Sequence, residues 1–297
     1  METNQDRLFI KFNEYFEMLD KAPLSPNSVF QTETQRGLYE SNLTFSFRKY
    51  QAAMYHLSRV KQLLEYDRLM AHKMGPSVLS DRFMENGEDL TATSFSYLEE
   101  PRYGHELVAF LAAIKTGLDF VATASSIHFR GISCDSIRTL MKLVIKKKTA
   151  PIIDEISARF SWLEELRNYR HHLLHRMVLR TFSGSHVSMK GGKVCHAIYP
   201  VIVPKSTPKR LMDTRKRRIE EQIIDIPNGL SFKQTHAIIQ YPDGKVKTLE
   251  HEIQIEASEG YERIECFMEH HLNMYIIFLT YAIDGFKRAG FEAKISL

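Results

Sequence analysis

The chain has 297 residues, of which 43% are hydrophobic and 11% aromatic, so it can bury a real core and is not globally disordered. Its formal net charge of +4 is too small to indicate a nucleic-acid-binding protein by itself. The three cysteines are scattered along the chain, which argues against a disulfide framework and against a cysteine-based zinc site.

Nothing near the first residue resembles a secretory signal. The start is polar and acidic, without a basic stretch followed by an apolar run. The most apolar segment, residues 106–129, is interrupted by Lys115, Asp119 and His128. We therefore expect it to be a buried core helix rather than a membrane span, and we expect a cytoplasmic protein.

The first third of the chain has the periodicity of two helices. Apolar residues at helical spacing predict a short amphipathic helix over residues 7–20, ended by the prolines that follow. A longer helix is expected at about 41–73, closed by Gly75 and Pro76. Residues 76–103 are polar and irregular in pattern.

Three further helices are predicted in the middle of the chain. One spans about 104–129, and Gly131 ends it in a left-handed conformation. Ser133 or Asp135 then caps a shorter helix that runs to a lysine cluster at 146–148. Pro151 suits a first helical position, and a third helix is expected from there to about residue 177.

From residue 178 onward the pattern becomes strand-like. Residues 178–182 and 193–203 are rich in β-branched and aromatic side chains and flank two glycines, which predicts a hairpin. A second hairpin is predicted across the turn sequence at 241–244. A last helix is expected at about 261–288.

Long helices with apolar faces need one another for burial, so this order of elements predicts a mainly α protein built as a helical bundle. The bundle is expected over 1–177, a β-rich insertion over 178–257 and a closing bundle helix over 258–297, together forming one domain.

The helix that ends near residue 177 carries an unusually dense polar cluster. At 100° per residue, Asn168, His172 and His175 fall on one stripe, and Arg167 and His171 fall on a neighbouring one. A solvated basic helix end is one explanation, because cations near a helix C-terminus complement its dipole. A functional site is the other.

The run Arg167-Asn168-Tyr169-Arg170-His171-His172 resembles the motif of the HEPN superfamily: an arginine, a polar residue, three further positions and a histidine near the end of a long bundle helix. The resemblance covers roughly 41–177 and 258–288, not the β-rich segment. One departure is Leu174, where some toxin members carry a tyrosine.

The resemblance implies an HEPN-like bundle and a metal-independent endoribonuclease of toxin or defence type, without a cofactor, that works as a homodimer. His172 would then be the acid or base, Arg167 the phosphate stabiliser and Asn168 an orienting group, with Arg170, His171 and His175 as helpers. Histidine and arginine suit RNA cleavage by the 2′-OH, because this reaction needs proton transfer and charge neutralisation at phosphorus.

The resemblance also implies partners: RNA as substrate and an antitoxin or regulatory protein. The alternative is a non-catalytic HEPN-like protein that binds nucleotide, RNA or a protein partner, because a fold does not fix an activity. The expected RNA contacts lie in a basic run that is either a phosphate-binding patch or a solvated loop. They are Lys209, Arg210, Arg215, Lys216, Arg217 and Arg218.

Two further interpretations concern acids and metals. Glu106 and Asp119 lie in the apolar helix, and one of them is expected either to pair with Arg167 or Arg170 or to face solvent. His171 and His175, four residues apart, could bind zinc or iron together with the Glu269-His270-His271 run. No doubled carboxylate-x-x-His pattern supports this, so no metal is predicted.

Overall fold

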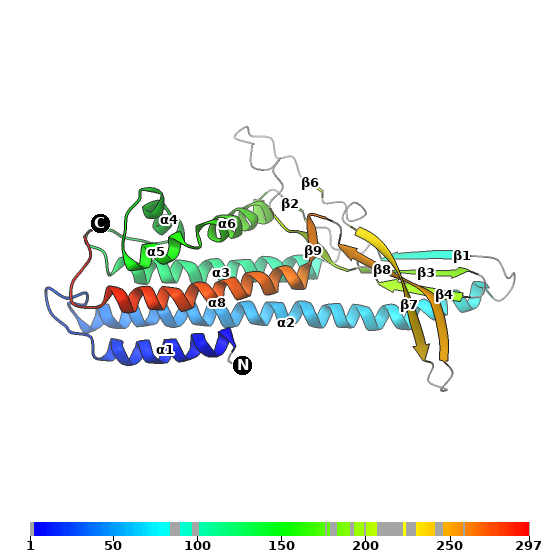
Figure 1. Ribbon diagram of the computed structural model, residues 1–297, viewed down its shortest axis with the longest axis horizontal. Helices are drawn as coiled ribbons and strands as arrows, with labels where there is room; N and C mark the ends of the chain where they lie inside the picture. The colour runs from blue at the N-terminus through cyan, green and yellow to red at the C-terminus, as the bar shows by residue number, and fades with distance from the viewer. Residues whose placement is uncertain are drawn as a thin grey trace. The chain divides into compact units, whose positions relative to one another are not determined.

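The computed structural model describes residues 3–83, 90–96, 101–175, 177–178, 183–190, 193–198, 200–206, 222–223, 230–240, 246–257 and 259–296. Over these residues the chain is mainly α, with seven helices and nine short or medium strands (Figure 1). It divides into two compact units that we describe separately. The first comprises Met1–His56, Val108–Arg170 and Met268–Leu297, and the second comprises Leu57–Leu107 and His171–Phe267.

Helix α1 (Asn4–Asp20) begins with a capping box that the sequence analysis did not anticipate. The Thr3 hydroxyl accepts from the Asp6 N–H, and the Asp6 carboxylate accepts from the Thr3 N–H, so two unsatisfied donors of the first turn are bonded. One apolar face of the helix, with Leu8, Phe12 and Tyr15, is buried. The amphipathic helix predicted at 7–20 is thus confirmed, three residues longer at its start.

Helix α2 (Glu33–Phe83) is much longer than predicted. The expectation that Gly75 and Pro76 close it was wrong, because the helix continues through both residues. A proline inside a helix removes one backbone hydrogen bond, and the bonds of neighbouring turns can keep the chain helical.

Helix α3 (Pro101–Ser126) corresponds to the long apolar helix predicted at 104–129. Among the described helices it is the one with the length and apolar composition to cross a membrane, and 56% of its apolar window is buried within the protein. Core helices of soluble proteins pass the same test. Gly131 has a φ of +70°, as predicted, although it lies five residues after the helix end.

Helix α4 (Ile137–Ile145) begins differently from the prediction. Its N-cap is Ser136, which makes no side-chain cap bond, rather than Ser133 or Asp135. The Ile137 N–H instead donates 3.1 Å to the carboxylate of Asp119 on α3, so an acid from another helix satisfies the first turn.

The helix predicted from residue 151 to about 177 is two helices. Helix α5 (Pro151–Ser157) starts with Pro151 at its first position, as expected, and α6 (Phe160–His175) follows after a two-residue break. Arg159 lies in that break. Its guanidinium binds the Glu155 carbonyl and carboxylate and stacks 3.9 Å from the Tyr281 ring centroid.

Helix α8 (Ile264–Ala289) contacts several helices of the first unit. Its Tyr275 hydroxyl donates 2.9 Å to the Ser46 carbonyl on α2. A methyl group on Gly117 of α3 would overlap the Tyr275 hydroxyl, so α3 and α8 approach closely at a residue without a side chain. This contact brings α2, α3 and α8 together in the core.

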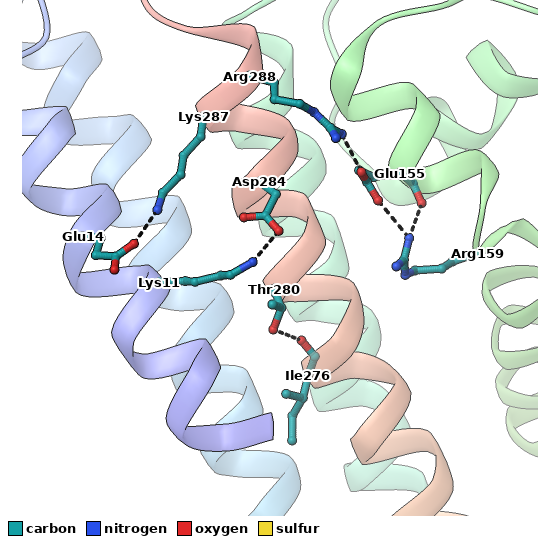
Figure 2. A network of polar contacts seen from close by, with 9 residues as sticks. All are labelled: Lys11, Glu14, Glu155, Arg159, Ile276, Thr280, Asp284, Lys287 and Arg288. Carbon is teal, nitrogen blue, oxygen red and sulfur yellow. Dashed lines mark hydrogen bonds and ion pairs between the residues drawn. The ribbon is translucent and has the colours of Figure 1, made fainter. Parts of the chain in front are cut away.

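Ion pairs align two more helices with the end of α8 (Figure 2). Lys11 and Glu14 of α1 bind Asp284 and Lys287, and Glu155 of α5 binds both Arg288 and Arg159. The pairs of Lys11 with Asp284 and of Lys287 with Glu14 reach solvent at both side chains, so they contribute little stability, whereas Glu155 and Arg159 are largely buried.

An aromatic cluster closes the first unit near the helix ends. The His128 imidazole Nε2 lies 3.1 Å from the Tyr39 hydroxyl, which is 2.7 Å from the Tyr15 hydroxyl. The imidazole also stacks on Phe286 with an interplanar angle of 13°. Burial lowers the pKa of His128 to about 3, so the ring is neutral in the folded protein.

All nine strands belong to the second unit. They are β1 (Leu90–Ser96), β2 (Met177–Val178), β3 (Ser183–Lys190), β4 (Lys193–Ile198), β5 (Ile202–Pro204), β6 (Gln222–Ile223), β7 (Leu230–Gln240), β8 (Val246–Ala257) and β9 (Tyr261–Arg263). The hairpins predicted around 191–192 and 241–244 are confirmed as β3–β4 and β7–β8, although the first strand is β3 rather than 178–182.

Two strands were not anticipated. β1 lies in the region read as irregular and pairs antiparallel with β3 to form a three-stranded sheet. β9 occupies the predicted first turn of the last helix and pairs with β5. Both pairings join segments that are far apart in the sequence, which periodicity does not reveal.

Candidate functional site

Helix α6, which carries the Arg167–His172 run, is fixed by its apolar face. Trp162, Leu163, Leu166 and Tyr169 are buried. The Trp162 indole N–H donates 3.0 Å to Nδ1 of His271 on α8. This bond between two buried side chains sets both the rotation and the position of α6 in the first unit.

The run alternates between buried and exposed positions. Arg167 and His171 are exposed, Asn168 and Arg170 are half-buried, and Tyr169 is buried. Part of Arg170 points inward, because its Nε is buried and has no hydrogen-bond partner among the described residues. The backbones of His172 and His175 lie on α6, and their side chains are outside the described set.

Arg167 and His171 form the exposed pair of this run. They are four residues apart in one helix, so they lie about 40° apart around its axis and share a face. Arg167 and His172 are five residues apart, or about 140°. The resemblance to the motif implies only a helper role for His171. Its exposure next to Arg167 makes it a second candidate for proton transfer.

The structure corrects the interpretation of Asp119. Its carboxylate forms an ion pair with Lys115 and accepts from the Ile137 N–H, so its partners are in α3 and α4 rather than at Arg167 or Arg170. The other acid, Glu106, is half-buried on α3 in the second unit. Because its carboxylate caps a neighbouring helix, Asp119 has a structural role, and we do not include it in the candidate site.

The histidines of α8 have a structural role. His271 is buried and accepts the Trp162 hydrogen bond, and burial together with nearby His270 lowers its pKa to about 3. His270 is exposed. Over the part of the chain that is described, no group of three His, Cys, Asp or Glu residues could hold a metal ion.

The basic run expected to contact RNA lies largely outside the described residues. This holds for Lys209, Arg210, Arg215, Lys216, Arg217 and Arg218, whereas Lys205 is described and exposed. The second cluster, Lys146–Lys148, is fully described, follows α4 and is exposed.

Comparisons with protein-family models, with curated proteins and with solved structures gave no match for this chain.

Proposed function

We propose that the protein is a cytoplasmic, metal-independent endoribonuclease of HEPN type, of the toxin or defence kind, that cleaves RNA as a homodimer. In this proposal the helices of residues 41–177 and 258–288 form an HEPN-like bundle, and residues 178–257 are an insertion before its closing helix. An antitoxin or regulatory protein would be a further partner.

One observation carries the proposal: α6 buries one face, where Trp162 bonds to His271, while exposed Arg167 and His171 lie four residues apart on another face. A guanidinium offers a planar set of donors to phosphate oxygens, and an imidazole exchanges protons near neutral pH. Asn168, half-buried at the edge of this face, could orient either group.

These groups suffice for transesterification. A histidine accepts the proton of the 2′-OH, whose oxygen attacks the adjacent phosphorus, while Arg167 neutralises the charge on the phosphate oxygens. The P–O5′ bond breaks, a protonated histidine supplies the proton to the leaving 5′-oxygen, and a 2′,3′-cyclic phosphate remains. Two histidines are needed at once, and His171 and His172 of one or both protomers could supply them.

The homodimer belongs to the proposal for a geometric reason. Arg167 and His172 are five residues apart, so their positions lie about 140° apart around an ideal helix, and one copy of α6 would not bring both to one phosphate. Two copies that meet edge to edge could combine Arg167 of one protomer with His172 of the other. Light scattering tests this directly, because a strictly monomeric protein would leave such a site incomplete.

The deciding experiment is cleavage of end-labelled RNA by the purified protein in EDTA, followed on a gel. Arg167→Ala and His172→Ala are each expected to reduce the rate by about 10²- to 10⁴-fold, the usual contribution of a proton-transfer or charge-stabilising group. His171→Ala tests the second histidine.

Arg130→Ala and His270→Ala are matched controls, because both side chains are exposed and lie outside α6. Neither is expected to change the rate. No cleavage by the wild type, or cleavage that survives both Arg167→Ala and His172→Ala, would refute the nuclease. RNA or nucleotide binding without cleavage would instead favour a non-catalytic HEPN-like protein.

A further inference from the structure

The exposed face of α4 and the turn after it carry a row of cations. Arg138, Lys142, Lys146, Lys147 and Lys148 are all exposed, and residues 136–153 contain no acid. Arg138, Lys142 and Lys146 follow one another at intervals of four residues, about 6 Å along the helix axis. They therefore line one side of the helix and lead into the lysine turn.

Within the part of the chain that the structure describes, one carboxylate influences this row: that of exposed Asp135, just before α4, which interacts electrostatically with Lys142 without forming an ion pair. No ion pair joins any of them to another described residue, whereas six cations elsewhere in the first unit do bind acids. The paired six are Lys11, Arg36, Lys115, Arg159, Lys287 and Arg288. The row of cations on α4 is therefore open to an external anion.

The helix dipole does not account for the whole row. Cations at the C-terminal end of α4 are favoured by the dipole, but Arg138 lies in the first turn, where a positive charge is disfavoured. Solvation of the C-terminal end of α4 would explain cations at that end, but not Arg138 at the other end.

The turn after α4 holds a lysine where glycine is usual. The Lys147 and Lys148 N–H groups donate to the Val144 and Leu143 carbonyls, which is the Schellman pattern, and Lys147 has a φ of +54°. A side chain is disfavoured in this left-handed conformation. Lys147 thus adds a charge to the row at a conformational cost.

We propose that this surface, Arg138, Lys142 and Lys146–Lys148, binds the phosphate backbone of RNA. Because it takes RNA as the ligand, the inference rests on the proposed function and extends it to substrate binding in the first unit. A linear array of exposed cations, none of them in an ion pair with a described acid, suits a chain of phosphates, where each contact releases a counterion.

An anionic membrane fits the surface less well. Membrane-surface helices insert a broad apolar face, but the apolar face of α4 is buried in the protein. Ile145 is the single large apolar side chain exposed on the helix, at 67%. The experiment therefore also measures binding to anionic lipid, so that a membrane surface can be told apart from an RNA surface.

The test uses the full-length protein and a fluorescein-labelled 2′-O-methyl RNA, which has no 2′-OH and is not cleaved. Lys142→Gln, Lys146→Gln and Lys148→Gln are combined and compared with a control that combines Lys21→Gln, Arg48→Gln and Arg130→Gln at other exposed positions. Both variants lose three charges. Fluorescence anisotropy at several salt concentrations gives the affinity and its salt dependence.

Removing three phosphate contacts should lower the slope of log Kd against log salt by about 2 and weaken binding roughly 100-fold near 0.1 M salt. The control should stay within a few-fold of wild type. A variant with arginine at the same three lysines should keep wild-type affinity, which separates charge from folding, and circular dichroism checks both triple variants.

The inference would be overturned if the two triple glutamine variants lost RNA affinity equally, or if the wild type did not bind RNA. Binding to phosphatidylserine vesicles that depends on α4, with RNA binding unaffected by the substitutions, would overturn it in favour of a membrane. The probe is not a substrate, so this result is independent of cleavage. Binding without cleavage of ordinary RNA would reject the nuclease and leave the RNA surface in place.

Discussion

Gly117→Ala should disrupt the contact between α3 and α8. A Cβ at this position would overlap the Tyr275 hydroxyl, lie 2.7 Å from its Cζ and 3.1 Å from the Lys49 Cβ. The Tyr275 side chain is fully buried and its hydroxyl donates to the Ser46 carbonyl, so the ring cannot turn aside without losing that bond.

Overpacking costs about 1–3 kcal/mol. An unsatisfied buried hydroxyl or carbonyl adds about 1–3 kcal/mol. The higher helix propensity of alanine returns about 1 kcal/mol. The free energy of unfolding should therefore fall by about 1–5 kcal/mol, measured by urea denaturation followed by circular dichroism.

Gly37→Ala is the matched control, since Gly37 is also helical, is exposed and has nothing within 4 Å of an added Cβ. It should raise the free energy of unfolding by about 0.5–1 kcal/mol. Combining Gly117→Ala with Tyr275→Phe should recover part of the loss, because the worst overlap is with the hydroxyl. If Gly117→Ala were as stable as Gly37→Ala, the close approach of α3 and α8 would be wrong.

Three further predictions concern stability. Burial lowers the pKa of His128 from 6.5 to about 3, so the unfolded chain gains the proton first as pH falls, and stability present above pH 6.5 is lost toward pH 3. His128→Phe should make the pH dependence of the unfolding free energy shallower in this window, by about 1.4 kcal/mol per pH unit, and an unchanged slope would contradict a buried neutral imidazole. Asp119→Ala should lower the free energy of unfolding, measured in urea, by about 1–2 kcal/mol, because the Ile137 N–H loses its acceptor. Asp119→Asn keeps an acceptor and should lower it less. Equal losses in the two variants would exclude the cap as the cause. Lys147→Gly should raise the free energy of unfolding by about 0.5–1 kcal/mol, and with it the thermal midpoint, because glycine adopts the positive φ of this residue without strain. A lower midpoint would mean that the lysine side chain stabilises the turn.

Much of the helical framework could be predicted because it depends on local signals. Pro151 at a first helical position, the left-handed Gly131 and the two turn sequences at 191–192 and 241–244 act within a few residues of themselves. The break between α5 and α6 was missed, because apolar spacing continues across it and the stacking of Arg159 on Tyr281 joins distant segments.

The surroundings of the candidate site were less accessible to prediction. Arg167, Asn168 and His171 could be placed on a helix from their spacing, but the bond from Trp162 that holds this helix ends on His271, more than a hundred residues later. Asp119 was one of two acids considered as a partner for Arg167 or Arg170, with a solvent-facing position as the alternative. Its carboxylate instead pairs with Lys115 and accepts from the Ile137 N–H, and backbone donors leave no trace in side-chain patterns.

The position of α8 has a consequence for how the chain is made. The N-terminal helix α1 and the Ser46 carbonyl of α2 both have their partners on α8, more than two hundred residues downstream. During synthesis from the N-terminus, the apolar faces of α1, α2 and α3 therefore emerge well before the helix that covers them. Such long-range contacts predict slow folding, with the apolar faces of α1, α2 and α3 uncovered until α8 has been synthesised.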